Sequence, residues 1–211
     1  MRKFKKFTVV FVPAMLAVSA CALCASAQTI EPTFSFSMED AFADGSYHVG
    51  FEMDDVTDKE IFAQMYSELY YDIVSIGQMK VGDTIETPDG DLEIKSIDQA
   101  ENEISINSGE YTLVNPEDTN GWYARDYELP VYELLGEAQL LLADEITLNT
   151  YKMKEDGSPN GRGYDTVECA PGELKENLEK LPFSDNGFYP SRVTVDLKDE
   201  KIEAVTIIYT P

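Results

Sequence analysis

The sequence contains a single histidine and only three cysteines, and this scarcity excludes several kinds of catalytic site. A hydrolytic triad needs a base beside its nucleophile, and the one histidine, His48, stands in the strand-like run GSYHVGFEM, where we interpret it as a surface or edge residue. His48 and the distant Cys169 cannot complete a tetrahedral zinc shell of nitrogen and sulfur ligands. A phosphate-binding loop is also missing, because the glycines of PNGRGYD lack the required lysine and the strand-to-helix context.

The start of the chain has the pattern of an export signal. Basic residues between Arg2 and Lys6 precede an uncharged, largely apolar run from Phe7 to Ile30. A membrane-spanning helix is the alternative, but it needs about 20 consecutive apolar residues, and Thr8, Pro13 and Ser19 interrupt this run. We therefore expect residues 1–27 to be a signal peptide.

Two processing sites compete within this leader. Ala25-Ser26-Ala27 has the small-x-small pattern that leaves Gln28 as the new N-terminus. Val18-Ser19-Ala20-Cys21 resembles the lipobox of bacterial lipoproteins, in which the cysteine is acylated. Either route predicts a product outside the cytoplasm, secreted or lipid-anchored to the cell envelope, with no transmembrane span in the mature chain.

The charge of the chain is strongly acidic. Lysine and arginine number 16 against 40 aspartates and glutamates, and removing the four basic residues before Gln28 takes the formal net charge from −24 to −28. Such a field repels nucleic acid and anionic lipid headgroups, so neither is expected as a partner. Cations, basic peptides and cationic surfaces remain permitted, although acidity also serves solubility alone.

Cysteine usage means that the fold must be held by its core. Cys21 and Cys24 fall in the leader, so Cys169 is alone in the mature chain and cannot form an internal disulfide. About 180 residues suffice to bury roughly 70% of the unfolded surface. Cys169 precedes a predicted helix, whose N-terminus can lower a thiol pKa, so a reactive thiol is the alternative to a buried one.

Turn sequences divide the chain after residue 45 into short β-branched and aromatic runs, which is typical of an antiparallel β protein. Three hairpins are predicted, around Pro88-Asp89-Gly90, around Asn107-Ser108-Gly109 and around the turn from Lys198 to Lys201. In the first, Thr84–Thr87 pairs with a strand over Asp91–Ile97. In the last, one strand has alternating apolar residues at Val193, Val195 and Leu197. It pairs with a strand whose inner face carries Ile202, Ala204, Thr206 and Ile208.

Two segments carry a helical pattern. APGELKENLEKLP places Leu174, Leu178 and Leu181 on one face between two prolines, which predicts a short amphipathic helix lying on the sheet. Residues 59–74 are ambiguous, since Thr57 with Glu60 resembles a capping box while the apolar positions fit a strand almost as well. We favour the strand, because Tyr70-Tyr71 and Ile73-Val74 are strand formers.

The hairpin sequences MKVGDTIETPDGDLEIKSI, INSGEYTLV and VTVDLKDEKIEAVTIIYTP resemble small exported β-rich proteins, uncharacterised in function, that recur in anaerobic gut bacteria. The resemblance implies a fold and a compartment, and no chemistry. We expect a mainly β fold, α+β at the margin, with antiparallel hairpins forming a barrel or a sandwich and one short helix near the C-terminus. Residues 28–45 are expected to be a tether or loosely docked arm, and 46–211 a single β-rich domain.

Two further features bear on ligands. DGSPNGRGYDTVE matches the first half of a calcium loop with Asp156, Ser158, Asn160 and Gly161, but Val167 takes the twelfth position and Glu168 comes one residue late. Calcium is thus a weak alternative to a plain turn. Four aromatic residues gather in TNGWYARDYELPVY, and we expect them to fill the core or cover a sheet face rather than form an exposed platform: Trp122, Tyr123, Tyr127 and Tyr132.

No catalytic, cofactor-binding or metal-binding residue can be assigned from these patterns. The sequence therefore favours an exported, non-enzymatic binding or interaction module of the bacterial cell envelope, with an unknown extracellular ligand or protein as partner. The alternatives are an acid-pair hydrolase, a Cys169-dependent enzyme and a calcium-stabilised structural module.

Overall fold

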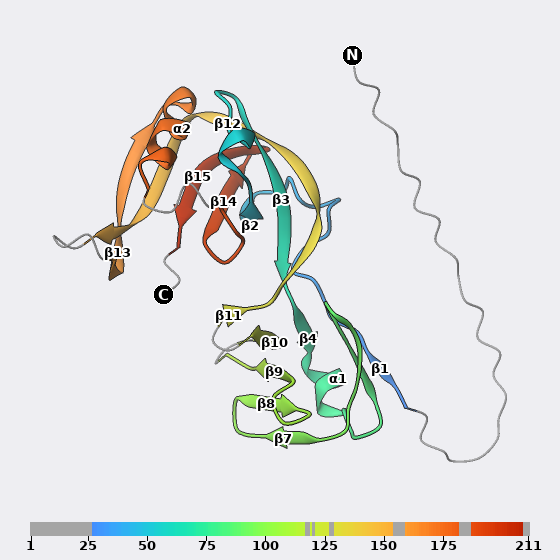
Figure 1. Ribbon diagram of the computed structural model, residues 1–211. Coiled ribbons are helices and arrows are strands. Elements are labelled where there is room, and N and C mark those ends of the chain that lie inside the picture. Colours follow the sequence, from blue (N-terminus) through green and yellow to red (C-terminus); the bar gives the residue numbers. More distant parts are fainter. Residues whose placement is uncertain are drawn as a thin grey trace.

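The computed structural model describes residues 27–116, 119, 121–126, 129–153, 159–181 and 187–208, without the side chains of 153 and 159–162. The chain is mainly β, as the sequence predicts, and Figure 1 shows two lobes joined at a waist. We call them the upper and lower lobes, as they stand in that figure. Each lobe has its own cluster of buried apolar side chains.

The upper lobe is a curved sheet with the strand order β13-β12-β15-β14-β2-β3. Strand β3 also pairs with the long strand β12, so five of the strands close into a ring. All pairs are antiparallel except β12 with β15. The elements of this lobe are β2 (Gly45–Gly50), the 3-10 turn η1 (Met53–Asp55), β3 (Glu60–Glu68), β12 (Tyr132–Met153), β13 (Pro159–Cys169), α2 (Pro171–Glu179), β14 (Val193–Lys198) and β15 (Lys201–Ile207).

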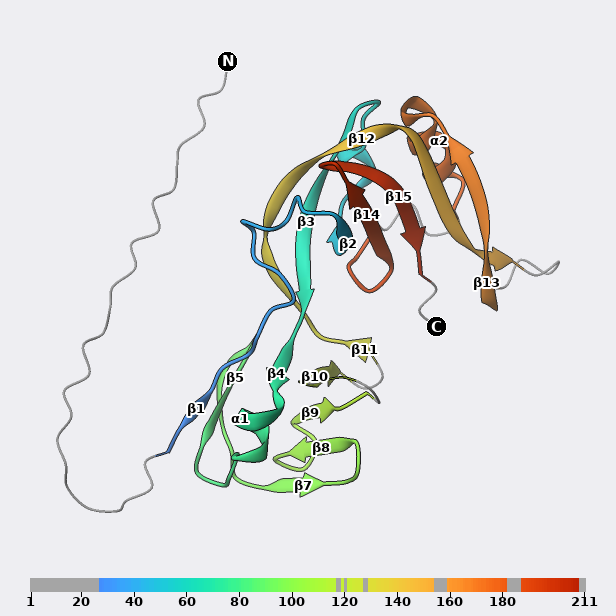
Figure 2. The ribbon, with the colours of Figure 1, turned by 180° about the vertical axis from the view of Figure 1, so that it is seen from behind.

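The lower lobe consists of two small sheets whose apolar faces share one core. One has the order β1-β5-β6, and the other has the order β11-β10-β9-β8-β7, with β4 paired to β10. Figure 2 shows the two sheets from behind, with α1 beside them. The elements are β1 (Thr29–Ile30), β4 (Tyr70–Asp72), α1 (Ile73–Gly77), β5 (Thr84–Thr87), β6 (Gly90–Glu93), β7 (Ile97–Gln99), β8 (Glu103–Ile106), β9 (Tyr111–Val114), β10 (Gly121–Asp126) and β11 (Leu129–Pro130).

The three predicted hairpins are present, but two of them differ in detail from the prediction. Gly90 adopts φ +112°, which only glycine tolerates readily, and closes the β5–β6 turn. The strand expected over Asp91–Ile97 divides into β6 and β7. The Asn107 side-chain oxygen accepts the backbone N–H groups of Lys95 and Ser96, so these two groups do not form hydrogen bonds with a neighbouring strand.

The C-terminal hairpin contains an irregularity that the alternation of the sequence does not reveal. Its register shifts between Asp196 and Leu197, which is the effect of a β-bulge. Beyond this shift, Val205 and Ile207 face the core, whereas the prediction had placed Ala204 and Thr206 on the inner face. Ile202 is buried as predicted.

Residues 60–72 are extended, which confirms the strand over the helix, although Ile73 onward forms the short helix α1. The apparent capping box at Thr57 closes a tight turn instead. Thr57 Oγ1 accepts the Glu60 N–H at 3.2 Å, and Val56 then pairs with Ile61 across the turn. A helix cap and a strand turn use the same bond, so the pattern alone could not separate them.

The predicted amphipathic helix is present as α2, with Leu174 and Leu178 fully buried and Leu181 partly buried against the upper core. Pro171 occupies the first turn, as expected. Pro182, the predicted stop, lies outside the described residues.

The segment before β2 docks on both lobes. Ile30 is buried in the lower core, where β1 runs parallel to β5, and Ala41 is buried in the upper core. The Phe36 ring meets the edge of the Tyr47 ring, with centroids 4.9 Å apart. The division of the chain into an arm and a single domain over 46–211 stays a prediction.

A buried tyrosine, Tyr71, and a partly buried one, Tyr111, make the lower lobe sensitive to alkali. The Tyr71 hydroxyl donates to the Glu86 carbonyl at 2.6 Å and lies 2.8 Å from the Tyr111 hydroxyl. Burial raises the pKa of Tyr71, and it raises the pKa of Tyr111 to about 12. Because tyrosines in the unfolded chain ionise near pH 10, the unfolded state loses protons first, and the contribution of these two tyrosines to the free energy of unfolding should be constant below about pH 10 and fall above it.

Urea denaturation followed by circular dichroism between pH 8 and 11 tests this expectation. Tyr111→Phe should flatten the alkaline decline, whereas the control Tyr164→Phe, at an exposed tyrosine, should leave it as in the wild type. An unchanged decline in Tyr111→Phe would contradict the assignment.

Candidate functional site

The upper lobe carries a hollow of about 590 Å³ on the outer face of its ring, within the range of roughly 300–1,000 Å³ that ligand pockets occupy. It is formed by the end of β2, η1, β3, β12 and the segment around Phe188. The side chains that give it chemical character are three aromatics and three acids, namely Phe62, Tyr66, Tyr189, Glu52, Asp55 and Glu137. None of the described residues that line it is a lysine, arginine or histidine.

The alternation of side chains along β3 determines which aromatic residues line the floor of the hollow. On β3, Ile61, Ala63 and Met65 point into the core, so Phe62 and Tyr66 point outward into the hollow. Phe62 is 48% exposed although it is a large apolar side chain. Tyr66 donates to the Gln64 side-chain oxygen at 2.8 Å, which orients its ring.

Cross-strand pairing brings β12 to the same floor. Gln64 lies opposite Glu137 and Phe62 lies opposite Gln139, so acid and amide groups alternate with the rings. The Gln139 amide donates to Glu60, which fixes this edge of the hollow.

Two acids are held side by side at the other end. The Glu52 backbone carbonyl accepts the Asp55 N–H at 3.0 Å, and Asp55 Oδ2 accepts the Glu52 N–H, also at 3.0 Å. Gly187, at φ +72°, makes room for them, since a Cβ there would lie 2.6 Å from Glu52 Oε2. The Asp55 carboxylate is thus positioned by this bond and the Glu52 carboxylate occupies the space beside Gly187, and no ion pair to either occurs in the described part of the chain.

Phe188 forms the rear wall. It exchanges two backbone hydrogen bonds with Phe51, at 2.9 and 3.0 Å, and the two rings stack with centroids 4.8 Å apart. Phe188 is only 2% exposed, whereas the next residue, Tyr189, is 51% exposed and projects its ring toward solvent at the rim.

Of the two alternatives for His48, a surface or an edge residue, the edge is wrong, because β2 lies between β14 and β3. Its Nδ1 is 2.8 Å from the Pro190 carbonyl oxygen, and its ring lies against Tyr132 with centroids 4.8 Å apart. Burial raises the pKa of Tyr132. His48 is therefore half-buried and supports the packing of β2.

Cys169 is 4% exposed, within the upper core. Its Sγ is 3.6 Å from the Ile146 carbonyl oxygen, and burial raises the pKa of the thiol. A nucleophilic cysteine needs the opposite shift, so the geometry argues against the Cys169-dependent enzyme.

The calcium-loop sequence falls at the end of the β12–β13 ribbon. Asp156 and Ser158, and the side chains of Asn160 and Gly161, lie outside the described residues. Val167 and Glu168 are ordinary strand residues of β13, opposite Leu148 and Thr147, and Glu168 accepts a hydrogen bond from the Thr147 hydroxyl. Elsewhere in the described ranges, no group of three or more His, Cys, Asp or Glu side chains could hold a metal ion.

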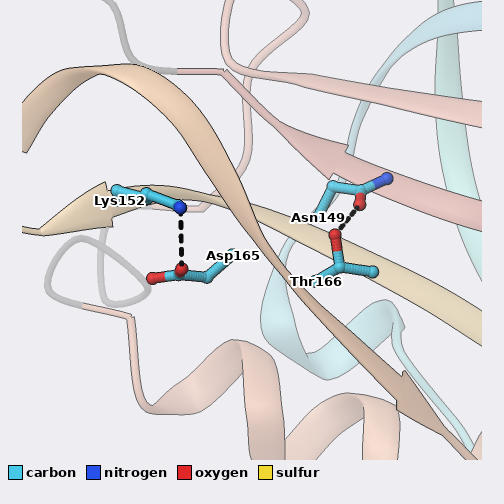
Figure 3. Close-up of polar contacts among 4 residues, drawn as sticks. All are labelled: Asn149, Lys152, Asp165 and Thr166. Carbon is cyan, nitrogen blue, oxygen red and sulfur yellow. Dashed lines mark hydrogen bonds and ion pairs between the residues drawn. The ribbon is translucent and has the colours of Figure 1, made fainter.

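Figure 3 shows how this ribbon is held by cross-strand polar pairs near its tip. Thr166 donates to the Asn149 side-chain oxygen at 2.9 Å, and Lys152 lies 3.9 Å from Asp165. Both charged side chains of the ion pair are about half exposed or more, so the pair contributes at most about 1 kcal/mol.

The aromatic cluster around Trp122 packs as predicted where it is described. Trp122 is buried in the lower core, and Tyr123 stacks on Tyr70 with centroids 5.6 Å apart. Tyr132 is half-buried against His48, and Tyr127 lies outside the described residues. The exposed and half-buried aromatic residues that line the hollow of the upper lobe are Phe62, Tyr66 and Tyr189, which the sequence analysis did not single out as ligand-binding candidates.

Comparison with known proteins adds no relative. No family model matches the chain, and no curated protein or solved structure matches it. Within the described ranges, no helix is both long and apolar enough to cross a membrane.

Proposed function

We propose that this protein is an exported, non-enzymatic binding module of the bacterial cell envelope, and that it binds cationic ligands in the hollow of the upper lobe. The observation that carries the proposal is the lining of this hollow, where three carboxylates and five aromatic residues meet without a basic residue among the described ones. Export rests on the leader sequence.

Charge and ring chemistry favour a cation over a neutral ligand. A ligand that covers the hollow removes water from Glu52, Asp55 and Glu137, which is unfavourable unless the ligand supplies the opposite charge. Aromatic faces such as those of Phe62 and Tyr66 attract lysine and arginine groups, by about 0.5–1 kcal/mol at exposed sites. A basic peptide segment satisfies both requirements, and the net charge of the chain also draws it in.

The same carboxylates raise the alternative of an acid-pair hydrolase. Glu52 and Glu137 are exposed to solvent, however, and the hollow does not provide the apolar enclosure that keeps the acid of a glycosidase protonated. Binding is therefore the better-supported function.

Titration of the purified mature chain with a hexalysine peptide, followed by calorimetry, tests the proposal. Neutralising the hollow with E52Q/D55N/E137Q should weaken binding at least about ten-fold, or about 1.4 kcal/mol. Asp55→Asn keeps the side-chain oxygen that accepts the Glu52 N–H and holds η1 together, so the fold should persist.

A matched control distinguishes binding in the hollow from nonspecific attraction of hexalysine to the acidic surface of the protein. The variant E93Q/D98N/E103Q removes the same charge from exposed acids of the lower lobe and should weaken binding less than about three-fold. Equal losses in the two variants would show that hexalysine binds the acidic surface without a site. Saturable turnover of a glycoside, ester or peptide substrate would overturn the non-enzymatic proposal itself.

The aromatic contribution has its own pair of variants. Phe62→Leu should weaken hexalysine binding about two- to five-fold, because the ring is lost while the strand and its apolar character remain. Phe42→Leu, at a phenylalanine of similar exposure outside the hollow, should have no effect. If a neutral oligosaccharide binds instead of hexalysine, and its binding depends on Phe62, the protein is still a binding module but its ligand is not a cation.

A further inference from the structure

Asp83 is a fully buried carboxylate directly before β5, and no cation among the described residues pairs with its charge. Its Oδ1 accepts the backbone N–H of Gln28 and its Oδ2 accepts that of Lys80, each at 3.1 Å. No ion pair to Asp83 occurs among the described residues. Buried carboxylates are normally paired, because an uncompensated charge in the interior is unfavourable.

Gln28 is the point at which the chain enters the lower lobe. Its carbonyl accepts the Thr84 N–H at 2.9 Å, and Ile30, two residues on, is fully buried beside β5. Ala27, the residue before it, is exposed. The bond between Ala27 and Gln28 thus joins an exposed residue to an anchored one, and it is the bond that the small-x-small sequence marks for cleavage.

We propose that cleavage of the Ala27–Gln28 bond supplies the missing cation, so that the new α-ammonium group of Gln28 pairs with Asp83 and locks the N-terminus into the lower lobe. Water adds across the peptide bond, its oxygen bonding to the Ala27 carbonyl carbon and its hydrogen passing to the Gln28 nitrogen. At neutral pH the released amine takes up a proton and the released carboxyl loses one, and no oxidant or reductant takes part.

The nitrogen that becomes charged already lies 3.1 Å from Asp83 Oδ1. A hydrogen bond from an uncharged amide to a carboxylate is thereby replaced by one between two opposite charges, which adds the Coulomb attraction of an ion pair. In the precursor, and in a chain acylated at Cys21, the Gln28 nitrogen stays an uncharged amide. The inference therefore depends on the cleavage part of the proposed function and is independent of the ligand.

The intact mass of the exported protein is the first test. A chain that begins at Gln28 agrees with the proposal, whereas a chain that carries a lipid on Cys21 overturns it, since the α-ammonium group would then be absent. Hexalysine binding is unaffected by this result, so the two proposals fail separately.

A double-mutant cycle of four proteins tests the ion pair between the Gln28 α-ammonium group and Asp83. Chains that begin at Gln28 or one residue earlier at Ala27 are each made with and without Asp83→Asn, and are released from a fusion by a protease that leaves no extra residue. Thermal unfolding is followed by the fluorescence of Trp122, the only tryptophan, which lies in the same core as Ile30. The Gln28 chain should melt at least about 3 °C above the Ala27 chain, and Asp83→Asn should abolish this difference. Equal midpoints, or a difference that survives Asp83→Asn, would overturn the pairing.

A chemical readout remains if the Asp83→Asn chains fail to fold. An N-terminal glutamine cyclises when its free amine attacks the side-chain carbonyl carbon and expels ammonia. A protonated amine held by Asp83 has no lone pair to attack with, so mass spectrometry should show cyclisation at least about ten-fold slower in the folded Gln28 chain than in the same chain in urea. Equal rates in the two states would contradict the ion pair.

Discussion

Replacing Phe188 with alanine is expected to lower the free energy of unfolding by about 3–5 kcal/mol. The ring is 2% exposed, stacks on Phe51 and belongs to the upper core, so its removal leaves a cavity that the paired backbone on either side cannot close. The same ring forms the rear wall of the hollow, so hexalysine binding should weaken as well. Urea denaturation measures the first effect and calorimetry the second.

Tyr189→Ala is the control for this prediction, one residue away. Tyr189 is half exposed and lies at the rim, so its loss should cost less than about 1 kcal/mol of stability while still weakening binding. Similar destabilisation by the two variants would show that Phe188 has no special place in the core.

Leu178→Ala in α2 is expected to cost about 2–5 kcal/mol. Leu178 is fully buried where α2 lies on the upper sheet, in the same buried cluster as Leu174 and Cys169. The variant should loosen the cover over Cys169, whose thiol meets the Asn177 side chain of the same helix, so a thiol reagent should label it faster. Labelling rates and urea midpoints together check both consequences.

Glu176→Ala, on the outer face of the same helix, provides the comparison. Glu176 forms an exposed ion pair with Lys180 at 3.0 Å, and its removal should change stability by no more than about 0.5 kcal/mol and leave the labelling rate of Cys169 unchanged. Faster labelling in Glu176→Ala would mean that α2 does not shield the thiol.

Local chemistry explains which elements the sequence could predict. The hairpins depend on neighbouring residues alone, such as Gly90 at positive φ, and α2 depends on three leucines at helical spacing and a proline in its first turn. The strand over 60–72 was harder, since Thr57 forms the same bond at a turn as at a helix cap. The bulge beside Leu197 and the break at Lys95 arise from contacts with other segments, which periodicity does not contain.

The candidate site could not be predicted because it is assembled from distant segments. Glu52, Phe62, Glu137 and Tyr189 come from four parts of the chain and meet only after the ring closes. Among 40 acidic residues, nothing in the sequence distinguishes Asp83 from the others until its burial is known. The same holds for His48, whose strand turned out to lie inside the sheet.

Closure of the ring also limits how copies of this protein can polymerise. Four strands of the ring have both of their neighbours within it, so in this sheet the free edge for docking another copy belongs to the β13 side of the ribbon. That strand begins with Pro159 and carries Asp165 and Glu168, and an identical strand laid against it would bring like charges together. Amyloid-like growth from the β13 edge is thus opposed by repulsion between like charges and by a proline at the start of the strand.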